Sequence, residues 1–357
     1  MSWVLAFVGF ALLVVLHEFG HFIVAKWVGM RVERFMLFFP PVLWSVKRGE
    51  TEYGIGAIPL GGYVRISGMN PREELTPEVE HRAYYKQKPW KRIVVILAGP
   101  AVNLIIAFVI LWAVVVFNGK GVITDEVESV ATGSPAAEVL RPGDRILAVD
   151  GVRGSTAELR EQIGTHICER EPTQGCQGSP AKLTVQRGER TVELTARPEY
   201  DAEVKRPLLG FSFGGELQTV GPVDGVGESA TLMWDITTAT VSAITKIFYD
   251  SEARDEVSSV VGGYETTRQA INTDIIVAIQ ILAIISLSLA IINLFPFLPL
   301  DGGHVFWALA EKVRGKPIPF SVMERAGVIG FVLILFVFLV GLTNDIDRLR
   351  GEGFGIR

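Results

Sequence analysis

The sequence has few of the residues that build a thiolate metal site or a nucleic-acid surface. Its 357 residues include two cysteines and five histidines, and neither cysteine belongs to a C-x-x-C pair. We therefore do not expect a cysteine-rich metal site. Basic residues are spread out and interrupted by acids, and the net charge is −5, so we expect no nucleic-acid partner. No internal repeat or low-complexity tract is present, whereas 49% of the residues are hydrophobic.

The apolar residues are gathered in four blocks and are not spread through one core. The blocks cover residues 2–25, 93–117, 274–296 and 326–343. Each has about 18 to 25 residues, enough at ~1.5 Å per residue to cross ~30 Å of hydrocarbon. We therefore expect an α-helical polytopic membrane protein with about four transmembrane helices.

The charge distribution predicts how these spans are oriented. Residues 22–92 carry a net charge of +5, and residues 118–273 carry a net charge of −9. Because basic loops are retained in the cytoplasm, we expect the loop 26–92 inside and the segment 118–273 outside, together with both termini. No Lys or Arg precedes the first block and no small-residue cleavage site ends it, so we expect it to stay as an anchor.

Between the spans the sequence predicts one β element and one soluble domain. The stretch Tyr53–Gly68 is rich in glycine and β-formers, which predicts a membrane-associated hairpin or short sheet. Residues 230–249 predict an amphipathic helix that leads back toward the bilayer. The expected organisation is a membrane core in two halves, 1–118 and 274–357, with a soluble domain at 119–222 and an amphipathic connector at 223–273.

The first apolar block contains His17-Glu18-Phe19-Gly20-His21, an H-E-x-x-H. On a helix, positions i and i+4 share a face, so both imidazoles can bind one metal ion. Glu18 beside them can act as a general base toward water. Zinc accepts two imidazole nitrogens and one carboxylate, with the fourth position open. An ionisable side chain at mid-helix in lipid costs roughly 2.5 to 3.5 kcal/mol, which favours a metal over the alternative, a polar cluster satisfied by other helices.

The best candidate for the third ligand is Asp301, in N-L-F-P-F-L-P-L-D-G-G-H at residues 293–304. Pro296 and Pro299 break a helix, which frees a carboxylate to approach the first span. The alternative is that Asp301 caps the following helix, with the two glycines as turn residues. We expect His304 to be a turn or helix-start residue.

Together these residues resemble the site-2 protease family of M50 intramembrane zinc metalloproteases, in its bacterial regulator-of-sigma-E protease branch. The matches are H-E-F-G-H at 17–21, G-P-x-x-N from Gly99 to Asn103, and N-x-F-P-x-x-P-L-D-G-G-H at 293–304. They lie in three separate spans in family order, and the resemblance covers nearly the whole chain. It implies that His17, His21 and Asp301 bind Zn²⁺ and that Glu18 activates water.

The resemblance also implies a substrate class and a location. The enzyme would cut transmembrane segments of single-span membrane proteins such as anti-sigma factors, or remnant signal peptides, in regulated intramembrane proteolysis at the inner (plasma) membrane. The β element is implied to pair with an unwound substrate by β-augmentation. Asn103 and Asn293 are implied to hold the substrate backbone in an extended form, and interhelical hydrogen bonding is the alternative.

The soluble domain resembles a PDZ domain, which we expect on the extracytoplasmic side. The matching run is residues 133–151, with a short helix, a turn at Pro142–Asp144 and then a strand. Such a domain either binds an extended chain or acts as a size filter over the membrane site. Cys168 and Cys176 lie in an insert that ordinary PDZ domains lack; a disulfide fits an extracytoplasmic domain, while free thiols or a metal site with His166 stay open.

Two other classes of protein, an adaptor and a transporter, are alternatives to a protease. A non-catalytic PDZ membrane adaptor would not need the intact set of His17, Glu18, His21 and Asp301. A metal transporter usually shows repeated halves and more spans, and the sequence shows neither. We therefore favour an intramembrane zinc metalloendopeptidase.

Overall fold

The computed structural model describes residues 1–70, 72–168, 173–202, 204–316 and 318–351. It divides into two compact units: a helical unit of Met1–Val115 with Gly221–Arg357, and a β-rich unit of Val116–Val220. Four helices are long and apolar enough to cross a membrane, namely α1 (Ser2–Trp27), α3 (Pro89–Phe117), α8 (Ile275–Asn293) and α10 (Phe320–Arg350). The four apolar helices predicted from the sequence are thereby confirmed as helices.

Two of these helices begin or end at other residues than the apolar blocks do. Helix α8 ends at Asn293 and not at residue 296, because the turn that leads to Pro296 begins earlier than the apolar run ends. Helix α10 extends from Phe320 to Arg350, well beyond residues 326–343. Polar residues at both ends of that apolar block continue the helix, and hydropathy alone does not register them.

The β element is larger than predicted. β1 (Val32–Arg48) and β2 (Thr51–Ile66) form an antiparallel pair in which Phe35 is opposite both Tyr53 and Val64. The first part of β1 therefore lies between the two halves of β2.

The prediction that confined this element to Tyr53–Gly68 was wrong, since β1 is its other half. Residues 35–46 are an almost unbroken apolar run around Pro40 and Pro41. Such a run lacks the alternation that marks a strand, and internal prolines argue against one.

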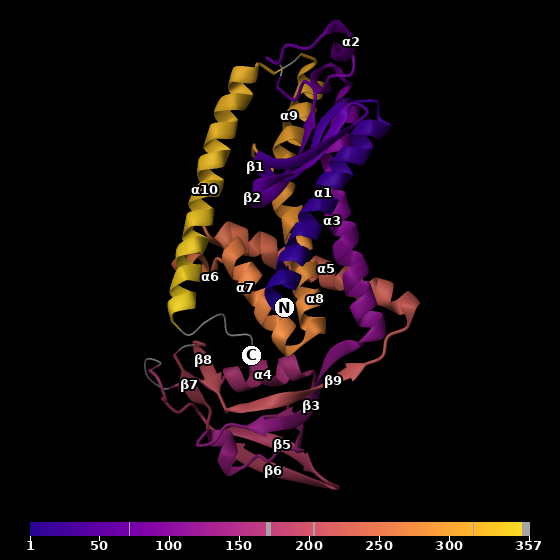
Figure 1. The fold of residues 1–357 in the computed structure, drawn as a ribbon. Helices are drawn as coiled ribbons and strands as arrows, with labels where there is room; N and C mark the ends of the chain where they lie inside the picture. The colour runs from indigo at the N-terminus through magenta and orange to yellow at the C-terminus, as the bar shows by residue number, and fades with distance from the viewer. Residues whose placement is uncertain (71, 169–172, 203, 317, 352–357) are drawn as a thin grey trace. The chain divides into compact units, whose positions relative to one another are not determined.

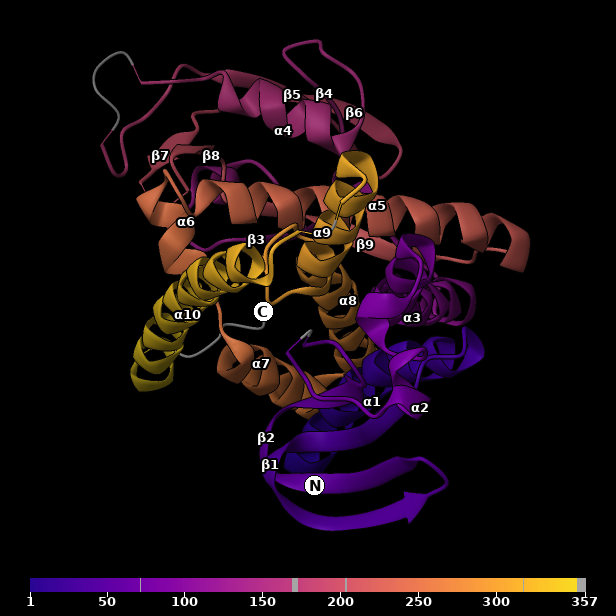
Figure 2. The same ribbon diagram turned by 90° about the horizontal axis from the view of Figure 1, so that it is seen from above.

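The remaining elements complete the helical unit. They are α2 (Pro77–Glu80), η1 (Tyr84–Lys86), α5 (Pro222–Lys246), α6 (Ser251–Glu256), α7 (Val260–Thr273) and α9 (Asp301–Arg314). The predicted amphipathic helix at 230–249 corresponds to α5, which begins eight residues earlier, at Pro222. Within this unit the four apolar helices alternate in direction, and β1, β2, α2 and α9 lie at the end where α1 finishes (Figure 1). Seen from above, α7 and α8 lie between α10 and the pair of α1 and α3 (Figure 2).

Helix α10 is joined to α7 by a buried carboxylate that the sequence did not lead us to expect. Asp345 is 0% exposed and accepts hydrogen bonds from the hydroxyls of Ser258 and Ser259, both at 2.6 Å. It also accepts from the backbone N–H groups of Ser259 and Gly262, both at 2.8 Å. These donors surround the start of α7, where free N–H groups favour an anion, so Asp345 fixes the end of α10 to that helix.

The β-rich unit is an antiparallel sheet with one covering helix. Its strands are β3 (Lys120–Val130), β4 (Arg145–Val149), β5 (Ala181–Arg187), β6 (Arg190–Ala196) and β9 (Phe211–Gln218), in the order β6-β5-β4-β3-β9. A separate small pair is β7 (Glu199–Asp201) with β8 (Arg206–Leu208). The predicted order of short helix, turn and strand is present as η2 (Pro135–Glu138), Pro142–Asp144 and β4.

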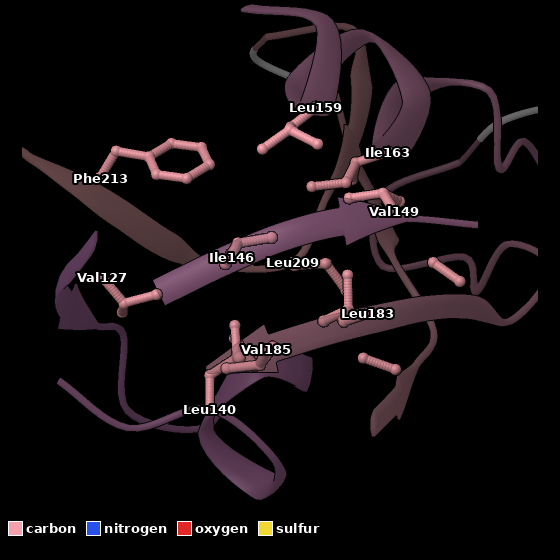
Figure 3. Packing of buried hydrophobic residues seen from close by; sticks show 13 residues of the cluster. Val127, Leu140, Ile146, Val149, Leu159, Ile163, Leu183, Val185, Leu209 and Phe213 are labelled. Atoms are coloured by element: carbon pink, nitrogen blue, oxygen red, sulfur yellow. The ribbon is translucent and has the colours of Figure 1, made fainter. Parts of the chain in front are cut away.

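The core of this unit lies between the sheet and α4 (Thr156–Gly164). Leu159 and Ile163 of α4 pack toward Ile146 and Val149 of β4 (Figure 3). Beyond the helix, Cys168 and Cys176 form a disulfide bond, which removes free thiols and a thiolate metal site from the alternatives.

Candidate metal centre

Three side chains that are distant in sequence converge on one point of the helical unit. His17 and His21 project from α1, and Asp301 is the first residue of α9. Asp301 Oδ2 lies 3.3 Å from His17 Nε2 and 3.2 Å from His21 Nε2, and the two Nε2 atoms are 3.3 Å apart. Both histidines are buried, at 7% exposure each. Among the described residues, His17, His21 and Asp301 form a group whose side-chain donor atoms are close enough together to hold one metal ion.

The spacing of these three atoms fits zinc. A tetrahedral site with bonds of about 2.0 to 2.1 Å has ligand atoms about 3.3 Å apart. The observed triangle, with edges of 3.2 to 3.3 Å, therefore matches one face of a zinc tetrahedron. The fourth position remains available for water or substrate.

The protonation pattern of the ligands supports the same assignment. His21 Nδ1 lies 2.9 Å from the backbone oxygen of Val95, so it donates its proton there and leaves Nε2 of the neutral ring unprotonated. Asp301 Oδ2 is buried and has no hydrogen-bond donor among the described residues. A buried carboxylate that faces unprotonated nitrogens needs a cation to compensate it, and a zinc ion at this point would supply the charge.

The end of α8 and the start of α9 direct Asp301 toward α1. Leu300, and not Asp301, is the N-cap of α9, and no side-chain capping bond is formed, so Asp301 does not act as a helix cap. A Cβ on Gly302 would lie 2.2 Å from the carbonyl oxygen of Leu294, and one on Gly303 would lie 2.5 Å from the nitrogen of Leu298. Both glycines therefore permit the preceding loop to fold against the first turn of α9. His304 lies in that turn, as expected.

Helix α3 passes directly behind the two histidines because it has a glycine there. A Cβ on Gly99 would lie 2.2 Å from His21 Nε2 and 2.9 Å from His17 Cε1. On the opposing helix, a Cβ on Gly20 would lie 2.5 Å from the carbonyl oxygen of Ala98. The two glycines allow α1 and α3 to cross at the metal centre, which gives a physical reason for a motif known from the sequence only by resemblance.

Glu18 lies between the two histidines in sequence and faces the β element. Gly62 of β2 lies against its side chain, since a Cβ there would be 3.1 Å from Glu18 Cγ. The strand therefore borders the residue expected to act as the base.

The two asparagines occupy different environments. Asn103 on α3 is 0% exposed, and its Nδ2 atom lies 3.2 Å from His17 Nδ1. This is an interhelical contact with one of the two converging histidines. Asn293 is half-buried and is the last residue of α8. The structure thus brings His17, His21, Asp301 and Asn103 together and leaves Asn293 at the helix end.

An H-E-x-x-H on an apolar helix, completed by an aspartate after another apolar helix, defines a zinc-dependent membrane peptidase. The family model for peptidase family M50 matches residues 5–337, and the chain belongs to that family. It is 33% identical to the zinc metalloprotease Rip1 of Mycobacterium tuberculosis, over 97% of this chain and 98% of that protein, and equally similar to Rip1 of Mycobacterium bovis. The protein is therefore a zinc metalloendopeptidase of the site-2 protease type, with Zn²⁺ as its cofactor.

Solved PDZ domains are also similar to part of the chain. The PDZ domain of the SdrC-like protein of Listeria innocua is 23% identical, covers 25% of this chain and 92% of its own, and has a TM-score of 0.22. The corresponding domain from Listeria monocytogenes is 23% identical, covers 26% of this chain and 90% of its own, and has a TM-score of 0.21.

Proposed function

We propose that this protein cuts transmembrane segments of single-span membrane proteins within the bilayer, as a step of regulated intramembrane proteolysis. Anti-sigma factors and remnant signal peptides are the substrate class. In this proposal His17, His21 and Asp301 hold zinc, and Glu18 is the general base. The observation that carries it is the triangle of donor atoms, buried where apolar helices α1, α3 and α8 meet.

Hydrolysis requires an activated water and a group that transfers its proton. Zinc, when bound, supplies Lewis-acid chemistry that lowers the pKa of water and polarises a carbonyl. Glu18 takes the proton of the attacking water and gives it to the leaving amine. Gly62 of β2 packs against the side chain of Glu18 and restricts where it can lie.

The β element is suited to present an unwound substrate to Glu18. A transmembrane helix must open locally before cleavage, because its carbonyls are otherwise hydrogen-bonded. β1 pairs with one side of Gly62–Ile66, and no other described strand pairs with the opposite side. An extended substrate segment can add there as a strand. Asn293, at the end of α8, is proposed to bind the substrate backbone.

The proposed location is the inner membrane, with the loop 26–92 in the cytoplasm and the β-rich unit outside. The net charges of +5 for residues 22–92 and −9 for residues 118–273 support this orientation. Leu43 and Trp44 on β1 are 70% and 60% exposed, which fits a β element in contact with lipid. We retain 1–118 and 274–357 as the protease core, 119–222 as the PDZ-like domain and 223–273 as the connector.

Cysteine labelling in intact cells tests this orientation. Glu189→Cys, in the exposed turn between β5 and β6, is expected to react with a membrane-impermeant maleimide applied from outside. Arg48→Cys, at the exposed end of β1, is expected to react only after the membrane is permeabilised. The native cysteines are bonded to each other and give the unlabelled background. Labelling of Arg48→Cys alone in intact cells would show the opposite orientation.

The proposed activity is tested with purified protein in proteoliposomes that also contain a single-span anti-sigma factor. We expect cleavage within the substrate's transmembrane segment, faster after its exterior domain has been removed, with the cut mapped by mass spectrometry. His21→Ala is expected to be inactive. Binding without any cleavage would favour the adaptor, and zinc flux into the vesicles would favour the transporter.

A further inference from the structure

The contact between Asn103 and His17 is unfavourable in two ways: one polar atom lacks a partner, and two hydrogen-bond donors face each other. The amide nitrogen Nδ2 of Asn103 lies 3.2 Å from His17 Nδ1. The amide oxygen Oδ1 is buried and has no hydrogen-bond partner among the residues that the structure describes. In this orientation the side chain points its donor at the imidazole and leaves its acceptor unsatisfied, which is costly for a fully buried group.

The second conflict concerns the imidazole itself. A histidine that binds a metal through Nε2 carries its proton on Nδ1 when the ring is neutral. The Nε2 atom of His17 is the one that faces Asp301 and His21, so Nδ1 must be the protonated nitrogen. An N–H on His17 Nδ1 and an NH₂ on Asn103 would then be two donors facing each other.

A single rotation of the Asn103 amide removes the opposition of two donors at His17 and gives Oδ1 a partner, while Nδ2 takes the former place of Oδ1. The oxygen and nitrogen of an asparagine have nearly the same shape, and their assignment follows from the hydrogen-bond network. With the amide turned by 180°, Oδ1 accepts the proton of His17 Nδ1 and is no longer unsatisfied.

We propose that Asn103 is a positioning residue, which holds His17 in the Nδ1-protonated tautomer through an Nδ1–H···Oδ1 bond and so directs Nε2 at the metal. This inference rests on the proposed zinc site, and it replaces the role in substrate binding implied by the resemblance.

The surroundings of Asn103 suit this role. Its side chain is 0% exposed, so it is shielded from a substrate. Its backbone oxygen accepts a hydrogen bond of 3.0 Å from the hydroxyl of Ser286 in α8, which fixes the position of the residue. His21 is held in the same way by the backbone oxygen of Val95. Helix α3 therefore supplies the outer hydrogen-bond partner of both histidines.

The test is the zinc affinity of the detergent-solubilised full-length chain, measured by competition with a chromophoric chelator. Asn103→Leu has a similar size but no acceptor, and we expect it to bind zinc about 10- to 100-fold more weakly, the usual cost of losing such a partner. Asn103→Asp has acceptors only, and we expect it to retain the wild-type affinity or exceed it. Asn118→Leu, at an exposed position just past α3, is the matched control and should be unchanged.

The aspartate variant separates the two orientations of the amide. If Nδ2 donates to His17, Asn103→Asp loses that bond and binds as weakly as Asn103→Leu, which would overturn the proposal. Wild-type affinity of a folded Asn103→Leu would overturn it as well. If the leucine variant does not fold, the zinc affinity of Asn103→Asp alone tests the proposal. The visible spectrum of the Co²⁺-substituted protein is a second readout, expected to stay tetrahedral in Asn103→Asp. Absence of zinc from the wild type would instead refute the proposed function itself.

Discussion

Glu18→Gln is expected to bind zinc like the wild type and to cut its substrate about 10²- to 10⁴-fold more slowly, the usual contribution of a general base. Glutamine has the size of glutamate and can lie in the same place against Gly62, but it cannot take a proton from water. Glu18 is not one of the three residues whose donor atoms converge, so the metal should remain. The measurements are the initial rate of cleavage in proteoliposomes and the zinc content of the same preparation.

The matched control is Glu138→Gln, at an exposed position in the β-rich unit, which should leave both quantities unchanged. Substantial cleavage by zinc-loaded Glu18→Gln would show that another group acts as the base. Loss of zinc from this variant would instead make Glu18 a part of the metal site.

Gly99→Ala is expected to weaken zinc binding and cleavage together, although it changes no group that takes part in the chemistry. The added Cβ would lie 2.2 Å from His21 Nε2 and 2.9 Å from His17 Cε1, so the ligands or the helix must move. Gly20 on the opposing helix is already in close contact with Ala98, so the packing of α1 against α3 restricts how far either helix can shift. Because zinc requires near-tetrahedral placement of its ligands, we expect its affinity to fall by about 100-fold or more.

The control for this substitution is Gly263→Ala in α7, where a Cβ would meet neighbours only at 3.7 and 3.9 Å. Overpacking alone costs about 1 to 3 kcal/mol of stability, so the thermal unfolding of both variants should be compared in zinc-free protein. A folded Gly99→Ala with wild-type zinc affinity would show that the histidines do not lie against α3 as described.

The elements that the sequence predicted well depend on local patterns. The four apolar helices follow from the length of each apolar block, and the pairing of His17 with His21 follows from the i, i+4 spacing on a helix. The convergence of Asp301 with them is a tertiary contact, and it was accessible only because Pro296 and Pro299 mark a break in the helix.

The features that were missed depend on contacts between distant segments. β1 does not alternate, and only its pairing on both sides with β2 shows that it is a strand. The space required at Gly99 and the hydrogen bond at Asn103 exist only because α1 and α3 cross at the metal centre. Asp345 lies in a short polar run at the end of an apolar helix, and its partners lie more than 80 residues earlier. A single sequence contains no local signal for any of these contacts.

The zinc content of the purified protein, measured together with that of Asp301→Ala and His21→Ala, tests the metal centre most directly. We predict one zinc per chain in the wild type and none above background in either variant, with all three proteins folded. Retention of a full zinc equivalent by folded Asp301→Ala would contradict the claim that an aspartate from the α8–α9 connection completes the site on α1.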